Sequence, residues 1–126
     1  MKQNLAIQEA NLEIGRIYHI HIDRPIGSSH PKHPDITYPI NYGYIEGLMG
    51  GDEEEQDVYV LDATTPLKEA VVTIIAVIYR ADDVETKWVG VVDPNKHYRD
   101  EEILDIIHFQ EQFYQSFVLC KQKTAR

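Results

Sequence analysis

Five short runs rich in β-branched and aromatic residues, followed by one helical run, constrain the fold of this chain most strongly. The five runs are RIYHIHID (16–23), TYPINYGYIEG (37–47), DVYVL (57–61), AVVTIIAVIYR (70–80) and ETKWVGVVD (85–93). Each has the length and the residue types of a β-strand, and segments rich in Gly, Pro, Ser and acidic residues separate them. Gly43, inside the second run, predicts a bulge or the close approach of a neighbouring strand.

The segment 100–117, DEEILDIIHFQEQFYQSF, has its apolar residues at helical spacing, with Asp100 as the predicted N-cap. Five strands and one helix predict a mainly β (α+β) fold, namely a small five-stranded OB-like barrel whose open end is covered by the C-terminal helix. Such barrels commonly hold a ligand in a groove across one face. We expect residues 1–126 to form a single domain, with 1–14 as a flexible or accessory N-terminal segment.

The charge balance excludes some classes of partner. The formal net charge is −9 and the sequence pI is about 5.0, whereas grooves that bind nucleic acid need a basic track. We therefore expect no nucleic-acid partner. We also expect no membrane partner, because no apolar run is long enough to span a bilayer and the first residues are too polar for a signal peptide. A single cysteine suits a reducing compartment, which predicts a cytoplasmic location.

Two acidic clusters are candidates for a metal site. Asp52, Glu54 and Asp57 precede the third run, and Asp82, Asp83 and Glu85 lie between the fourth and fifth. In a barrel both clusters can lie at the ends of neighbouring strands, where they would repel one another unless divalent cations were bound. Hard oxygen ligands without thiols select Mg²⁺ or a similar ion over zinc. Each cluster alone is more often a solvated loop, and we expect Glu53 and Glu55 to serve only solubility.

Three motifs in this order resemble those of the family I soluble inorganic pyrophosphatases. Residues 38–45, YPINYGYI, are similar to the family strand Tyr-Pro-x-Asn-Tyr-Gly-Tyr/Phe-Ile. Residues 52–58, DEEEQDV, resemble Asp-x-Asp-x-x-Asp-Val, with Glu54 at the middle aspartate. Residues 82–87, DDVETK, resemble the Asp-Glu…Asp-x-Lys hairpin, and His108-Phe109 resembles the start of a His-Phe-Phe-x-x-Tyr-Lys helix.

The resemblance implies Mg²⁺-dependent hydrolysis of inorganic pyrophosphate by a metal-activated water, with two or more Mg²⁺ ions and Mn²⁺ as a substitute. By the same resemblance the metal ligands are Asp52, Asp57, Asp82 and Glu85. Asp83 would support them from behind, and Glu54 and Asp57 would be the catalytic carboxylates. Tyr42, Lys87 and Lys32 would bind the phosphates. A homo-oligomer is also expected.

The sequence departs from the family pattern on the phosphate side. A hairpin that carries a phosphate-binding Arg in the family is missing between Asp23 and Tyr38, and Phe113-Tyr114 stands at the Tyr-Lys pair. By the resemblance, Asp23 stands where the family has a Glu, and Lys32, His30, His33 or Arg24 can compensate for the missing Arg from the loop. These departures leave two alternatives open: a metal-dependent phosphate- or nucleotide-binding module with weak or no catalysis, and a hydrolase of another phosphoanhydride.

Overall fold

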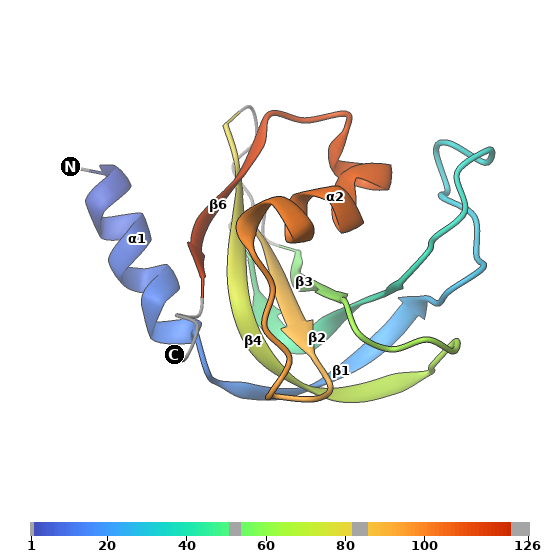
Figure 1. Cartoon of the computed structure of the whole chain (residues 1–126), viewed down its shortest axis with the longest axis horizontal. Coiled ribbons are helices and arrows are strands. Elements are labelled where there is room, and N and C mark those ends of the chain that lie inside the picture. The colour runs from blue at the N-terminus through green and yellow to red at the C-terminus, as the bar shows by residue number, and fades with distance from the viewer. Residues whose placement is uncertain (1, 51–53, 82–85, 122–126) are drawn as a thin grey trace.

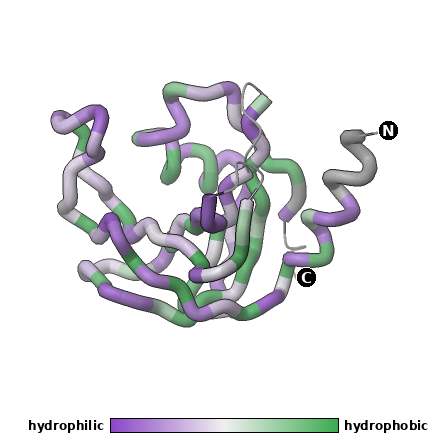
Figure 2. Tube along the Cα trace, turned by 180° about the vertical axis from the view of Figure 1, so that it is seen from behind, coloured by the Kyte–Doolittle hydropathy of each residue, from purple (hydrophilic) through white to green (hydrophobic). Residues whose placement is uncertain are grey.

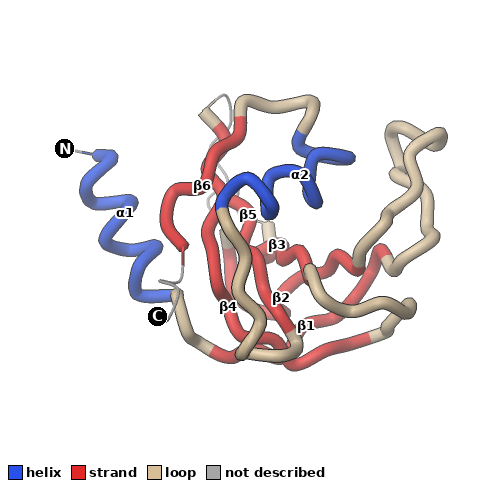
Figure 3. Tube along the Cα trace, viewed as in Figure 1, coloured by secondary structure: helices blue, strands red, loops and turns tan. Residues whose placement is uncertain are grey.

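The computed structural model of the chain describes residues 2–50, 54–81 and 86–121. Figures 1 and 3 show a strand-rich body with one helix packed against it and a second helix at its side. The elements in chain order are α1 (Lys2–Glu13), β1 (Ile17–Arg24), β2 (Asn41–Met49), β3 (Glu55–Val60), β4 (Glu69–Arg80), β5 (Thr86–Val91), α2 (Asp100–Glu111) and β6 (Ser116–Lys121).

Strands β1 to β5 form a closed barrel, which confirms the predicted fold. The strand order is β1-β2-β3-β5-β4, and β1 also pairs with β4, so the ring is complete. All of these pairings are antiparallel except β3–β5. The 12 residues of β4 make closure possible, because its first part (69–73) pairs with β1 while its remaining length continues along β5. Closure removes the exposed edges that an open sheet of this size would present.

The predicted helix 100–117 is too long, and a strand that was not predicted follows it. The helix ends at Glu111, and β6 (116–121) then pairs with residues 76–80 of β4. That edge of β4 is free because β1 pairs only with residues 69–73, and pairing with β6 satisfies its backbone groups. The N-cap is Arg99 rather than Asp100, and the Glu102 side chain accepts a hydrogen bond from the Arg99 backbone N–H (2.8 Å).

The second predicted strand begins later than expected. Thr37 forms only an isolated bridge with Ser29, and regular pairing starts at Asn41. Pro39 accounts for the delay, because proline has no backbone N–H to donate to a neighbouring strand. The residues between β1 and β2 therefore form a long loop, which extends away from the barrel in Figures 1 and 3.

The predicted N-terminal segment 1–14 contains the helix α1, which lies beside β6 at the side of the barrel (Figure 1). Ala10 of this helix is buried. Among the described residues no helix has the length and apolar character needed to cross a membrane.

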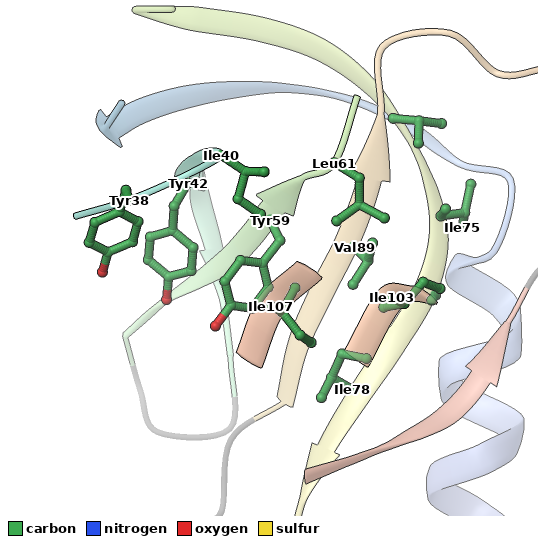
Figure 4. Close-up of a cluster of buried hydrophobic side chains, with 12 residues drawn as sticks. Tyr38, Ile40, Tyr42, Tyr59, Leu61, Ile75, Ile78, Val89, Ile103 and Ile107 are labelled. Carbon is green, nitrogen blue, oxygen red and sulfur yellow. The ribbon is translucent and has the colours of Figure 1, made fainter. Parts of the chain in front are cut away.

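Two hydrophobic clusters lie on opposite faces of the strands. Val58 and Val60 belong to a cluster that draws on all five barrel strands and fills the interior, while Tyr59 and Leu61 belong to the other cluster. The cluster that contains Tyr59 and Leu61 joins the outer face of the barrel to Ile103 and Ile107 of α2 (Figure 4). Helix α2 therefore lies against the outer face of the barrel rather than over its open end. In Figure 2 the hydrophobic residues follow the strands and α2, while the loop between β1 and β2 is mostly hydrophilic or neutral.

Gly43 marks a close approach between β1 and β2, as its position within a strand predicted. A Cβ atom at this residue would lie 1.9 Å from the His21 carbonyl oxygen, which no side chain can do. The neighbouring register shifts between Ile22 and Arg24, which is a β-bulge in β1.

Candidate functional site

The candidate site lies on the outer face of the barrel, beside the apolar surface that α2 covers. Tyr42 of β2, Asp57 of β3 and Lys87 of β5 come from three neighbouring strands. The Lys87 ammonium lies 2.5 Å from Asp57 Oδ2 and 5.7 Å from the centre of the Tyr42 ring. The Lys87 side chain is only 5% exposed, while that of Asp57 is 28% exposed. Asp57 is therefore accessible from the surface, whereas its partner Lys87 is buried.

The electrostatics keep Lys87 charged and Tyr42 neutral. Burial alone would lower the pKa of the Lys87 ammonium, but Tyr42 and Asp57 outweigh burial, so the pKa is raised above its ordinary value. Burial raises the pKa of the Tyr42 hydroxyl well above 10. The site therefore presents a fixed cation and a neutral phenol at physiological pH.

One hollow beside this triad is lined by carboxylates. It has a volume of about 230 Å³ and is bordered by Asp23, Arg24, Tyr42, Tyr44, Glu54, Glu55 and Asp57. The bulge in β1 explains why Asp23 and Arg24 both face it, because consecutive residues of a regular strand point to opposite faces. Partial desolvation raises the pKa of the Asp23 carboxyl, and the neighbouring Arg24 guanidinium opposes this rise without outweighing it.

Glu55 was expected to serve only solubility, but it lines this hollow. It is the first residue of β3, two positions before Asp57, so the two side chains share a face of the strand. Its carboxylate accepts a hydrogen bond from the Gly47 backbone N–H at 2.8 Å.

A second hollow on the other side of the triad is lined mostly by cations and polar groups. Its volume is about 180 Å³, and it is bordered by Arg24, His30, Pro31, Lys32, Tyr42, Asp57, Arg80, Lys87, Gln110 and Tyr114. The three predicted phosphate-binding residues, Tyr42, Lys87 and Lys32, all lie here. Arg24, Tyr42 and Asp57 border both hollows, so they form the wall between them.

Arg80 is the most deeply buried cation of the second hollow. It ends β4, is 2% exposed, and its Nε and Nη2 atoms donate to the two carboxylate oxygens of Glu111 at 2.9 and 2.6 Å. The guanidinium lies 3.6 Å from the centre of the Tyr114 ring, which orders it further. Burial alone would raise the pKa of the Glu111 carboxyl, but Arg80 outweighs burial and lowers it.

Aromatic contacts join the loop between β1 and β2 to the end of α2. The His33 ring stacks on Phe113 with centroids 4.2 Å apart, and His30 packs against His33 (5.0 Å) and stacks on Tyr38 (6.0 Å). Burial lowers the pKa of His30, so its ring is neutral near pH 7. These contacts hold Lys32, which lies between the two histidines in sequence, beside the second hollow.

Three of the four predicted metal ligands, Asp52, Asp82 and Glu85, lie outside the described residues, as does Asp83, which was predicted to support them. Within residues 2–50, 54–81 and 86–121, no three Asp, Glu, His or Cys side chains come close enough together to hold a metal ion. The donor chemistry of the first hollow nevertheless fits a divalent cation, because the carboxylates that border it are hard oxygen ligands.

The sequence did not predict Arg80, Gln110, Glu111 or Tyr114 as site residues. A signal was present for Arg80, because it ends a long apolar strand two positions before Asp82, and the end of a barrel strand is where a side chain can reach a site. Gln110 and Glu111 occupy positions at helical spacing with Ile103 and Ile107, and all four are buried. Polar residues on the buried stripe of a helix need partners, and Glu111 finds one in Arg80, which borders the second hollow.

Three comparisons relate the chain to known proteins. No model of a known protein family matches it. The inorganic pyrophosphatase of Mycoplasma genitalium is 30% identical over 99 residues, which cover 71% of this chain and 53% of that protein. The chain therefore spans about half the length of this curated relative.

Solved structures of inorganic pyrophosphatases share the fold. The enzyme from Ehrlichia chaffeensis superposes with a TM-score of 0.61 at 16% identity, covering 83% of this chain and 84% of that one. The enzyme from Thermus thermophilus gives a TM-score of 0.58 at 22% identity, covering 86% and 87%. The chain has the barrel fold of these proteins.

Proposed function

We infer that this chain, a relative of the inorganic pyrophosphatases in sequence and fold, is a hydrolase that splits inorganic pyrophosphate into two phosphates with bound Mg²⁺. The observation that carries the proposal is the wall formed by Arg24, Tyr42 and Asp57 between a carboxylate-lined and a cation-lined hollow. Phosphoryl transfer needs these two environments side by side, because the phosphates require positive charge while the metal ions require carboxylates.

The residues divide into two groups by the side of the wall on which they act. Asp57, with the predicted ligands Asp52, Asp82 and Glu85, holds the ions, and Asp83 orients these ligands. When bound, Mg²⁺ or Mn²⁺ supplies positive charge for the phosphoryl oxygens and makes water a better nucleophile near neutral pH. Lys87, Lys32 and Tyr42 donate to the phosphoryl oxygens from the second hollow.

The hydrolytic step needs one proton acceptor. The water oxygen forms a bond to one phosphorus atom while the bond from that phosphorus to the bridging oxygen breaks. Glu54 accepts the proton that the water loses, and the leaving phosphate carries away the electron pair of the broken bond. Lys87 binds the phosphoryl oxygens both before and during the step, because its raised pKa keeps it protonated.

The proposal is tested by measuring phosphate release from pyrophosphate with Mg²⁺, with Mn²⁺ and with EDTA. Tripolyphosphate and ATP serve as competing phosphoanhydrides. We expect release from pyrophosphate that requires the metal and that falls in Glu54→Gln, while Glu101→Gln, an exposed position on α2, retains it. If the chain binds pyrophosphate but releases no phosphate, it is a phosphate-binding module. If ATP is cleaved faster, the substrate is another phosphoanhydride.

We also infer a homo-oligomer that works in the cytoplasm. The first inference rests on apolar side chains that the described fold leaves exposed, Ile17 and Val71 among them. The second rests on the single cysteine, which cannot form an intrachain disulfide.

A further inference from the structure

Two arginines border the cation-lined hollow from different strands. Arg24 ends β1 and is half-buried, and Arg80 ends β4 and is 2% exposed. Neither lies in the three motifs that resemble the family. Arginine presents a planar fork of N–H donors that matches phosphate oxygens. Two such groups on one small hollow therefore indicate a place where a phosphate group can bind.

A buried chain of hydrogen bonds begins at Arg24. Its Nη1 donates to the Tyr38 hydroxyl at 2.7 Å, and that hydroxyl donates to the side-chain oxygen of Gln110. The Gln110 amide then donates to the Tyr59 hydroxyl at 2.8 Å. Figure 4 shows the rings of Tyr38, Tyr42 and Tyr59 in a row with their hydroxyl oxygens on the same side.

The chain ends at Arg80. The Tyr59 hydroxyl donates to Glu111 Oε2 at 2.5 Å, and Glu111 also accepts from Nε and Nη2 of Arg80. Ser116 of β6 donates to Glu111 Oε1 at 2.5 Å, which fixes the carboxylate from the other side. Arg80 borders the hollow and Glu111 does not. The Glu111 carboxylate therefore orients the guanidinium from the side that faces away from the hollow.

We propose that Arg24 and Arg80 form a clamp for one phosphate group, with Gln110 and Tyr59 as positioning residues that connect the two arginines. The proposal rests on the proposed function and deepens it, because the clamp supplies phosphate contacts in a chain that lacks the hairpin Arg of the family and has Phe113-Tyr114 at its Tyr-Lys pair. Tyr114 takes part through its stacking on Arg80 rather than through a charge of its own.

The burial of the connecting residues makes the clamp rigid before a ligand arrives. Gln110 and Glu111 are each 4% exposed, and Tyr38 and Tyr59 are 1% and 0% exposed. Among the described residues, no buried side-chain nitrogen or oxygen lacks a hydrogen-bond partner. A fully satisfied buried network holds its members in one geometry, so little entropy is lost when phosphate binds.

The clamp is tested by calorimetric titration of the full chain with inorganic phosphate, in EDTA and again with Mg²⁺. The variants are Arg24→Gln, the double variant Arg80→Gln/Glu111→Gln, and Gln110→Leu. Changing Arg80 and Glu111 together avoids leaving a single buried charge, which would unfold the chain for an unrelated reason. Arg16→Gln is the matched control, because the Arg16 side chain is 56% exposed and its partners Glu13 and Tyr18 are its near neighbours in sequence.

We expect Arg24→Gln and Arg80→Gln/Glu111→Gln each to raise the Kd for phosphate about tenfold or more, while Arg16→Gln leaves it unchanged. Gln110→Leu should weaken binding less in the Arg24→Gln background than in the wild-type background, because one of the two arginines that Gln110 positions is then absent. Equal effects in both backgrounds would refute the positioning role. Wild-type Kd values in both arginine variants, or a wild-type chain that does not bind phosphate, would refute the clamp.

The clamp and the hydrolase fail in different ways. A chain that loses phosphate binding in the arginine variants but never cleaves pyrophosphate keeps the clamp and refutes the hydrolase. A chain that cleaves pyrophosphate with an unchanged KM in both arginine variants keeps the hydrolase and refutes the clamp.

Discussion

Lys87 shows how a single buried residue can serve both sides of the site. Its ammonium lies against Asp57, which faces the carboxylate-lined hollow, while Lys87 itself borders the cation-lined one. Taking a lysine almost completely out of water is unfavourable unless an opposite charge compensates. Asp57 is that charge, so Lys87 depends on Asp57 for its charged state, and the ion pair fixes the positions of both side chains.

Replacing Lys87 by glutamine should weaken pyrophosphate binding more than it lowers turnover at saturation. The change removes one of the four cationic side chains that border the second hollow, and we expect KM to rise about tenfold or more. Steady-state kinetics measure the effect, with Lys68→Gln as a control at an exposed lysine. A wild-type KM in Lys87→Gln would show that the second hollow does not hold the substrate.

At the scale of elements, two irregularities of β1 and β2 shape the site. The bulge at residues 22–24 turns Asp23 and Arg24 toward the same side, and the close approach at Gly43 brings β2 against β1 at the same level of the barrel. Tyr42 and Tyr44 flank Gly43, so the approach also places the two tyrosines that border the carboxylate-lined hollow. The strands thus position the site through departures from regular pairing.

Replacing Gly43 by alanine should lower the free energy of unfolding by at least about 2 kcal/mol, because its Cβ would collide with the His21 carbonyl oxygen. Urea denaturation measures the change. Gly47→Ala is the comparison: nothing lies within 4 Å of its Cβ, and only its φ of +81° opposes the substitution, at about 1–2 kcal/mol. Equal losses in the two variants would contradict the close approach at Gly43.

The polar end of α2 makes stability depend on pH. Because the folded-state pKa of Glu111 lies below its ordinary value of 4.5, its contribution is fully present above pH 4.5 and is lost as the pH falls below that value. We expect this carboxylate to account for about 1–3 kcal/mol of the free energy of unfolding that disappears on acidification.

Denaturation at pH 7 and at successive values from 4.5 to 3 measures this loss. The Arg80→Gln/Glu111→Gln variant lacks the ion pair and should lose less stability than the wild type over the same range. An identical pH dependence in both proteins would show that Glu111 is not ion-paired in solution.

At the scale of the whole molecule, the described barrel leaves apolar surface exposed along β1 and β4. Ile17 is 66% exposed and Val71 is 57% exposed, and the pairing of β1 with β4 places them diagonally across the two strands. A symmetric contact with a second copy would bury this surface.

We expect the chain to form an oligomer that dissociates when Val71 is replaced by aspartate. Light scattering after size-exclusion chromatography should give a multiple of the 14.6 kDa chain mass for the wild type and a smaller mass for Val71→Asp. Thr64→Asp, at an exposed position outside the strands, serves as the control for added charge. A wild-type mass of one chain would contradict the expectation.

The barrel was predictable because its signal is local, whereas much of the site depends on contacts between distant segments. Alternating β-branched residues identify each strand, and a glycine inside a strand, Gly43, predicts the close approach of a neighbouring strand. Arg80 and Glu111 meet only because α2 packs beside the end of β4, and no spacing within either segment encodes that contact. The sequence pattern predicts a helix as far as residue 117 because Phe113 and Phe117 continue its apolar period. In the structure, residues 116–121 instead form a strand that pairs with the free edge of β4.

Phosphate release from pyrophosphate with Mg²⁺, measured for the wild type and for Asp57→Asn, is the most direct test of the proposed hydrolysis. Asp105→Asn, an exposed position on α2, is the matched control. We expect metal-dependent turnover in the wild type and in the control, and a loss of at least about a hundredfold in Asp57→Asn, which corresponds to about 2.7 kcal/mol of transition-state stabilisation. Turnover by Asp57→Asn at the wild-type rate, or no turnover by the wild type, would contradict the proposed hydrolysis.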